Sequence, residues 1–187
     1  MALSLLDPRT ALVVIDLQLG LAGYPTVHPL SSVIEKAAEL AAAFRRHELP
    51  VVLVTVNGGA PGRAEQSRVP ASRPEGWDQL VPELDAQPSD LRVSKSTWGA
   101  FASSDLEQRL RDLGVTQIVL AGVATSIGVE STARQAFEAG FNVTLATDAM
   151  TDVSLEAHEN SLLRIFPRLG ETGSSRDILA LLDSRPR

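Results

Sequence analysis

A carboxylate stands at the end of a run of five apolar residues. Asp16 follows directly after residues 11–15, which are alanine, leucine, valine and isoleucine. Burying a carboxylate without a partner is costly, so the pKa of such a group is expected to be perturbed. Asp16 is therefore a candidate catalytic acid or base. The alternative, that it caps a loop or pairs with an arginine, stays open at this point.

A lysine follows a weaker apolar segment at 91–93. Lys95 precedes several small and aromatic residues, and Trp98 and Phe101 among them could line a ligand pocket. Aromatic residues three apart in a sequence are also common as ordinary core. We treat Lys95 as a candidate cation for catalysis or binding, with Trp98 and Phe101 as candidate substrate contacts.

A turn that begins and ends with glycine, residues 122–128, follows the apolar run at 117–121. Gly128 falls in the first turn of a predicted helix, where unpaired backbone amides can bind an anion. Ala124 and Thr125 lie in the same turn and are candidate substrate contacts. Thr125 could instead cap the helix.

A long polar segment, residues 57–90, interrupts the regular pattern. It is rich in glycine, proline and arginine. Long loops inside an otherwise regular fold are commonly functional, so we expect this one to contact the substrate. Asn57 stands where the segment leaves the preceding apolar run. Arg63, Gln66 and Arg68 are candidate partners for a substrate carboxylate, and each could equally be a solvated loop residue.

Short apolar runs alternate with amphipathic segments along the chain, which is typical of βαβ units and a parallel sheet. We predict strands at 11–15, 51–56, 91–93, 117–121 and 142–146, and helices at 32–44, 104–113, 127–139, 154–166 and 174–182. Ligands of such sheets bind beyond the carboxyl ends of the strands. Because the candidate residues come at those ends, we expect them to converge.

Local signals predict where some of these helices begin and end. Ser32 with Glu35, and Ser104 with Glu107, have the spacing of capping boxes and predict the starts of the first two helices. Pro167 is expected to end the fourth helix, because proline cannot continue a regular helix.

Composition excludes several classes of function. The 187 residues carry 23 acidic and 17 basic side chains, a net charge of −6, and no basic cluster, which argues against nucleic acid as a partner. The absence of cysteine rules out a thiolate nucleophile, a zinc–thiolate site and an iron–sulfur cluster. We expect a cytoplasmic protein, because the apolar runs are too short to span a membrane and there is no basic leader.

Four segments together resemble the isochorismatase-like hydrolase family: residues 12–18, 95–101, 122–133 and 146–152. Each is modest alone, but their order and spacing are specific, and the resemblance covers nearly the whole chain. It implies an α/β fold, a three-layer α/β/α sandwich around a six-stranded, mostly parallel, Rossmann-like sheet. It also implies a single domain over residues 1–187 and a homodimer or higher homo-oligomer.

Many members of that family are amidases with an Asp–Lys–Cys triad and a cis peptide near the oxyanion site. Asp16 and Lys95 match the first two members of the triad, and the cis peptide is expected between Val123 and Ala124. Gly128 stands where the cysteine is expected. Amide hydrolysis through a thioester is therefore excluded.

Isochorismatases of the same family also lack the cysteine, and they hydrolyse an enol ether to release pyruvate. The resemblance therefore implies a cysteine-independent hydrolase acting on a small carboxylated molecule such as isochorismate. Asp16 is expected to act as general acid or base, and Lys95 to bind a substrate oxygen or carboxylate. Gly128 is expected to leave space in the site and to contribute backbone amides. No cofactor is expected.

Two alternatives remain open. The chain could be a binding protein that has kept the pocket and lost turnover. It could also be a serine hydrolase, because Ser126, Asp148 and His158 follow the chain order of one such class. Some family members hold a divalent metal, but the histidines here, His28, His47 and His158, are far apart in sequence, and we expect no bound metal.

Overall fold

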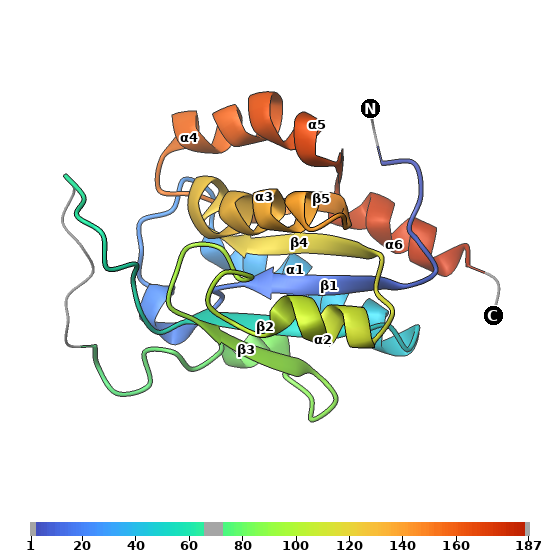
Figure 1. Cartoon of the computed structure of the whole chain (residues 1–187), viewed down its shortest axis with the longest axis horizontal. Coiled ribbons are helices and arrows are strands. Elements are labelled where there is room, and N and C mark those ends of the chain that lie inside the picture. The colour runs from blue at the N-terminus through green and yellow to red at the C-terminus, as the bar shows by residue number, and fades with distance from the viewer. Residues whose placement is uncertain (1–2, 66–72, 186–187) are drawn as a thin grey trace.

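Six parallel strands form the centre of the molecule (Figure 1). The computed structural model describes residues 3–65 and 73–185. The strands are β1 (Thr10–Ile15), β2 (Val51–Val56), β3 (Leu91–Lys95), β4 (Gln117–Val123), β5 (Asn142–Thr151) and β6 (Glu171–Gly173). Their order is β3-β2-β1-β4-β5-β6, and every neighbouring pair is parallel. The six-stranded sheet implied by the resemblance is confirmed.

The strand order reverses between β1 and β4. The chain builds the sheet outward from β1 through β2 to β3, then returns to place β4 on the other side of β1. In open α/β sheets the crevice for a ligand lies at such a reversal, beyond the carboxyl ends of the strands. The strand order therefore predicts a ligand crevice beside the residues that follow Ile15 and Val123.

Helices cover both faces of the sheet, which gives the three layers. On one face lie α1 (Leu30–Arg46) and α6 (Ser175–Asp183), and on the other lie α2 (Leu106–Asp112) and α3 (Glu130–Glu138). Beyond α3 runs a continuous helical stretch made of α4 (Leu155–Asn160), the π turn Ser161–Ile165 and α5 (Phe166–Leu169) (Figure 1). No described helix is long and apolar enough to span a membrane.

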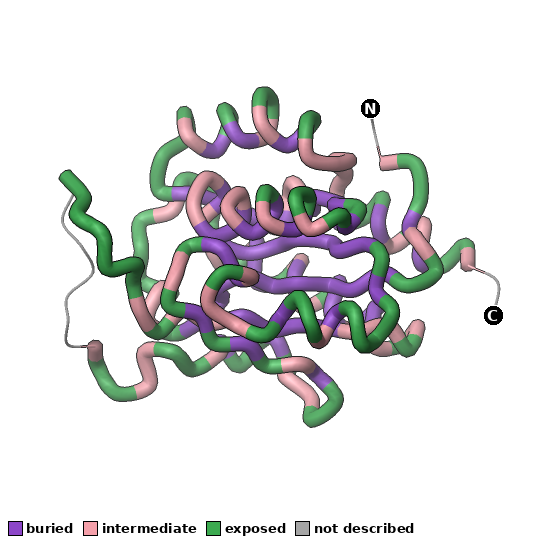
Figure 2. Tube along the Cα trace, viewed as in Figure 1, coloured by how far each residue is buried: buried purple, intermediate pink, exposed green. Residues whose placement is uncertain are grey.

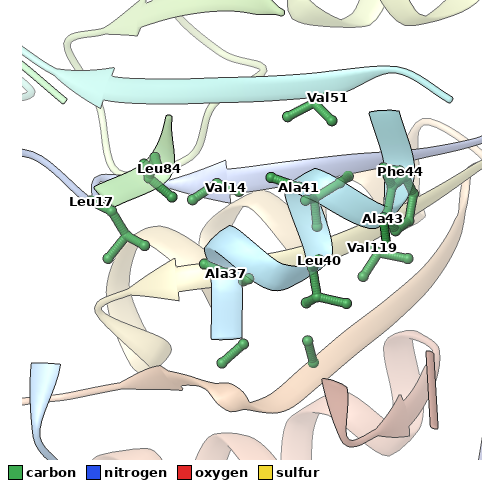
Figure 3. Packing of buried hydrophobic residues seen from close by; sticks show 14 of the residues in the cluster. Val14, Leu17, Ala37, Leu40, Ala41, Ala43, Phe44, Val51, Leu84 and Val119 are labelled. Carbon is green, nitrogen blue, oxygen red and sulfur yellow. The ribbon is translucent and has the colours of Figure 1, made fainter. Parts of the chain in front are cut away.

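Alternate residues of the strands supply two separate cores. In β1, Leu12 and Val14 pack toward α1, whereas Ala11, Val13 and Ile15 pack toward α2 and α3. Figure 3 shows the first core, where apolar side chains of α1 meet those of the sheet. Figure 2 shows the central strands as almost wholly buried. This two-sided burial explains why the central strands are mostly apolar on both faces rather than alternating.

Both predicted capping boxes are wrong in detail. The first helix begins at Leu30, directly after Pro29, so Ser32 lies inside it. Pro29 is the N-cap residue, with a non-helical ψ of 118°. The second helix begins at Leu106, whose amide donates to the Ser104 hydroxyl at 3.1 Å, without the reciprocal bond of a capping box.

The predicted end of the fourth helix at Pro167 is also wrong. Helical backbone continues to Leu169, because Pro167 lies in the first turn of α5, directly after the π turn Ser161–Ile165. The hydrogen-bond register changes there, so the missing amide of proline costs little. The sequence also gave no signal for β6, a three-residue edge strand, and placed the end of β5 five residues too early.

Candidate active site

Asp16 is presented at the carboxyl end of β1 by a turn of the backbone. Its φ of +56° lies in the left-handed region, which aspartate tolerates better than most residues. Its amide still donates to the carbonyl of Val54 at 2.9 Å, so the residue remains attached to the sheet. The chain leaves the strand at this point, and the carboxylate is fixed where the strand order reverses.

Lys95, the last residue of β3, forms a buried ion pair with Asp16. Its Nζ lies 2.7 Å from Asp16 Oδ2, and the two side chains are 1% and 7% exposed. Nζ also donates to the carbonyl of Thr97 at 3.1 Å. The pair joins residues 79 apart in sequence and confirms the predicted convergence of Asp16 and Lys95.

The carboxyl group of Asp16 has an unusual protonation equilibrium. Burial raises its pKa from the ordinary value of 3.8 to about 6, although the positive charge and hydrogen bond of Lys95 act in the opposite direction. Its second oxygen, Oδ1, is buried and has no hydrogen-bond partner among the described residues. A buried acceptor left open in this way is a position for a ligand or a proton.

Asp16 is expected to make the free energy of unfolding depend on pH. Because its pKa is higher in the folded state, the folded protein binds the extra proton between about pH 3.8 and 6. Its contribution to stability is complete below that window and is lost as the pH rises through about 6, with a slope of up to about 1.4 kcal/mol per pH unit. Denaturant titrations of the wild type and Asp16→Asn should show that slope only in the wild type. An identical pH dependence in both proteins would refute the shifted pKa.

Gly128 lies against Asp16, within the π turn Thr125–Val129. A Cβ atom built on Gly128 would come within 3.2 Å of Asp16 Oδ2, 2.9 Å of Ile15 Cγ2 and 3.0 Å of the Val123 carbonyl. Asp16, Lys95 and Gly128 therefore form one cluster. The backbone at this position is packed closely enough that even a methyl group requires a neighbour to move.

The turn after β4 is held in place by the chain that follows β5. The peptide bond between Val123 and Ala124 is cis, as the resemblance implied. Asp152 Oδ2 accepts hydrogen bonds from the amide and hydroxyl of Ser126 at 2.7 and 2.8 Å. The Thr125 hydroxyl lies 2.8 Å from Nδ1 of His158 and is fully buried. The side chain of Thr125 therefore anchors the turn to α4.

These contacts exclude the serine hydrolase alternative. The Ser126 hydroxyl bonds to Asp152 and His158 bonds to Thr125, so the two are not a nucleophile–base pair. Asp148 is engaged elsewhere, with Lys36 and Ser175. Burial, together with the nearby His28 ring, lowers the pKa of His158, which is consistent with a neutral structural histidine.

Arg73 and Trp77 stand out at the carboxyl end of β2, although the sequence did not single them out for binding. The Arg73 guanidinium donates to the carbonyls of Asn57 and Gly58 and lies 5.6 Å from the centre of the Trp77 ring. Arg73 Nε and Trp77 Nε1 are both buried and lack acceptors among the described residues. Trp77 is fixed beside Gln18, whose Nε2 donates to the Trp77 carbonyl at 3.0 Å. Nothing in the sequence distinguishes Arg73 from the neighbouring loop arginines.

The other predicted substrate contacts have mixed outcomes. Asn57 meets the site through its backbone, since its amide donates to the Lys95 carbonyl at 2.9 Å. Trp98 is 63% exposed, and Arg63 is exposed on the long loop. Phe101 is half-buried, and its ring packs on Phe141 at the edge of the core that α3 covers. Gln66 and Arg68 lie outside the described residues.

Two surface hollows elsewhere lack the buried charged groups of this site. One lies at the amino ends of β4 and β5, beside Gln117 and Asn142, and another lies beside β3, near Thr55 and Arg92. Neither is lined by a buried charged side chain. Among the described residues no three histidine, aspartate or glutamate side chains gather as metal ligands do, so no step of the chemistry is assigned to a metal.

Comparison with known proteins defines the family. A model of the isochorismatase domain matches residues 10–177 of the chain. The chain belongs to the isochorismatase family. It is a hydrolase of that family, whose members include amidohydrolases and a nicotinamidase. The match covers all the site residues described above.

Relatives of this isochorismatase family member support the assignment over most of its length. The uncharacterised isochorismatase family protein YecD of Escherichia coli O157:H7 is 45% identical over 183 residues, covering 92% of this chain and 96% of YecD. The ureidoacrylate amidohydrolase RutB of Pseudomonas syringae pv. syringae is 32% identical over 201 residues, covering 90% of this chain and 82% of RutB. A solved structure of an isochorismatase family protein from Burkholderia thailandensis has a TM-score of 0.92 and 40% identity, covering 96% of this chain and 98% of that one.

Proposed function

We propose that this protein hydrolyses the enol ether of a small carboxylated substrate, with isochorismate as the first candidate, and that Asp16 is the general acid. The observation that carries the proposal is a buried carboxyl group whose pKa is raised to about 6, beside a glycine at the position of the family's nucleophile. A group with that pKa is protonated in roughly a tenth of molecules at pH 7. It can therefore donate a proton near neutrality.

The reaction needs no nucleophile from the protein. The Asp16 carboxyl proton adds to the terminal carbon of the enol ether, which leaves an oxocarbenium ion at the ether carbon. Water adds to that carbon and gives a hemiketal, and the lost proton returns to the Asp16 carboxylate. The hemiketal then breaks into the alcohol and pyruvate. Hydrolysis consumes one water molecule overall, and the enzyme regains its proton.

Lys95 and Gly128 have supporting roles in this proposal. The Lys95 ammonium, 2.7 Å from Asp16 Oδ2, stabilises the carboxylate that forms after proton transfer. A substrate carboxylate beside it offsets its charge and favours the protonated acid. Glycine at 128 lets the turn pack against Asp16 without displacing its carboxyl group.

Arg73 and Trp77 offer a site for the substrate carboxylate. Each has a buried N–H group without an acceptor, and the Arg73 guanidinium carries the positive charge. Charged hydrogen bonds of this type are the strong ones in ligand recognition. The backbone of Asn57 connects the two parts of the proposed site, since its carbonyl accepts from Arg73 and its amide donates to the backbone carbonyl of Lys95.

Arg73→Ala is expected to raise KM by about 10- to 100-fold with a smaller change in kcat, because it removes charged hydrogen bonds to the bound carboxylate. Arg73→Lys should recover only part of the loss, since lysine cannot reproduce the planar donor geometry. Steady-state kinetics of the three proteins test this. An unchanged KM in Arg73→Ala would remove this residue from the binding site.

The proposal is tested by offering the enzyme an enol ether and amides side by side. We expect pyruvate from isochorismate and no ammonia from nicotinamide or ureidoacrylate, because no thiolate is present to form a thioester. Ammonia release without pyruvate release would contradict the proposal. Tight binding of isochorismate without turnover would instead support a binding protein.

A further inference from the structure

We propose that the outer face of the helix built from α4, the π turn and α5 is an interface for a second copy of this chain, packed antiparallel. The face consists of a band of residues that we call the outer stripe. Its members are Leu155, Glu156, Glu159, Leu163, Arg164 and Arg168.

The outer stripe is a continuous exposed band. Exposed positions recur at steps of four in two rows. One row holds residues 155, 159, 163 and 167, and the other holds residues 156, 160, 164 and 168; every residue in both rows is exposed. In a regular α-helix a step of four drifts by about 40° around the axis. The π turn in the middle is wider and offsets this drift, so the rows stay on one side. Figure 2 shows the outer side of this helix exposed and its inner side buried.

Two leucines of the stripe are exposed on a helix face that is otherwise mostly polar. Leu163 is 72% exposed and Leu155 is 50% exposed. Val153, two residues before Leu155, is 49% exposed. A cluster of exposed apolar side chains on one helix face is typical of surfaces that bind another protein.

The charges of the stripe are segregated by sign. Glu156 and Glu159 lie in the first half of the helix, whereas Arg164 and Arg168 lie in the second half. None of the four forms an ion pair or a side-chain hydrogen bond within the described part of the chain. Arg164 and Arg168 are four residues apart, where like charges repel each other. The isolated chain therefore leaves these charges unpaired.

This pattern is complementary to itself when two copies run antiparallel. A two-fold axis near residue 162 places Glu156 opposite Arg168 of the second copy and Glu159 opposite Arg164 of the second copy. Leu163 then lies close to the axis and meets its own equivalent. A symmetric dimer requires one patch to match itself in this way. The helix dipole also favours acidic residues first and basic residues last, but it gives no reason for the exposed leucines.

The stripe alone is smaller than a typical stable interface. The stripe extends about 18 Å along the helix from Glu156 to Arg168. A strip of that length covers less area than the roughly 800 Å² that each partner of a stable dimer buries. The neighbouring helix α3 packs against α5, and its Phe137 is 50% exposed. We therefore place the stripe at the centre of the interface, with Val153 and α3 at its edges.

Charge reversal tests the pairing by sedimentation equilibrium on the full chain. One variant carries Glu156→Arg and Glu159→Arg, and the other carries Arg164→Glu and Arg168→Glu. Each should raise the dimer dissociation constant at least about 30-fold, because like charges then face each other. An equimolar mixture of the two should form a heterodimer close to wild-type affinity, since both ends of the antiparallel pair become complementary again.

A matched control is Glu35→Arg with Glu39→Arg, which changes the charge equally on the exposed side of α1. This control should dimerise like the wild type. Recovery of dimers in the mixture also shows that both reversed variants fold. The proposal is overturned if the wild type stays monomeric up to about 100 µM, well above ordinary dimer affinities. It is equally overturned if the reversed variants dimerise like the wild type, or if their mixture does not.

Discussion

Asp16→Asn is expected to reduce kcat for pyruvate release by about 10²- to 10⁴-fold, the usual contribution of a general acid. Asparagine keeps the shape of the side chain but has no proton of suitable pKa to give. The substrate should still bind, since the variant keeps Lys95 and Arg73. Single-turnover kinetics with separately measured substrate affinity distinguish lost chemistry from lost binding.

Asp90→Asn is the matched control for this variant. Asp90 is also a buried carboxylate in an ion pair of 2.7 Å, with Arg45, but it lies at the opposite end of β3 from Lys95. Breaking either buried pair leaves a cation without its partner, so both variants should lose stability by a few kcal/mol. Only Asp16→Asn should lose turnover. Comparable activity losses in the two would mean that the effect is one of stability and would contradict the assigned role.

Gly128→Cys is expected to give a less stable and less active enzyme and not an amidase. A Cβ at this position would come within 2.9 Å of Ile15 Cγ2 and 3.0 Å of the Val123 carbonyl, both parts of the packed sheet. Overpacking of this kind typically costs about 1–3 kcal/mol, and displacement of Asp16 should lower turnover by about 10-fold or more. Thermal denaturation and assays for pyruvate and ammonia measure these effects.

Gly128→Ala and Gly23→Ala separate the causes of that loss. Gly128→Ala adds the same Cβ without a thiol and should show a similar loss of stability and turnover. Gly23 has no atom within 4 Å of an added Cβ, so Gly23→Ala should be close to wild type. If Gly128→Cys released ammonia from an amide at a substantial rate, the site would be an amidase site that lacks only its nucleophile. That result would contradict this account.

Much of the fold could be predicted from the sequence because two-sided burial has a strong signature. The runs that became β1, β2, β4 and the first half of β5 are mostly apolar on both faces, as buried parallel strands require. The errors occur where local signals compete with tertiary contacts. β5 continues past Asp148 because its later residues pair again with β4 after a shift in register. Pro167 does not end the helix because a π turn precedes it.

The candidate site was predictable where residues stand at strand ends. Asp16 and Lys95 converge because all parallel strands end at the same edge of the sheet, and only β2 lies between β1 and β3. Arg73 and Trp77 could not be predicted, because a loop has no periodicity that fixes side-chain direction. The orientation of Phe101 could not be predicted for a related reason, since an aromatic residue in a loop can face either the pocket or the core.

The pH dependence of kcat/KM for pyruvate release from isochorismate, between about pH 4.5 and 8, tests the central claim most directly. If protonated Asp16 is the acid, pyruvate is released and kcat/KM falls as the pH rises through about 6. If no pyruvate forms at any pH, or if kcat/KM instead rises through pH 6 to a plateau, the claim that Asp16 donates the proton is contradicted.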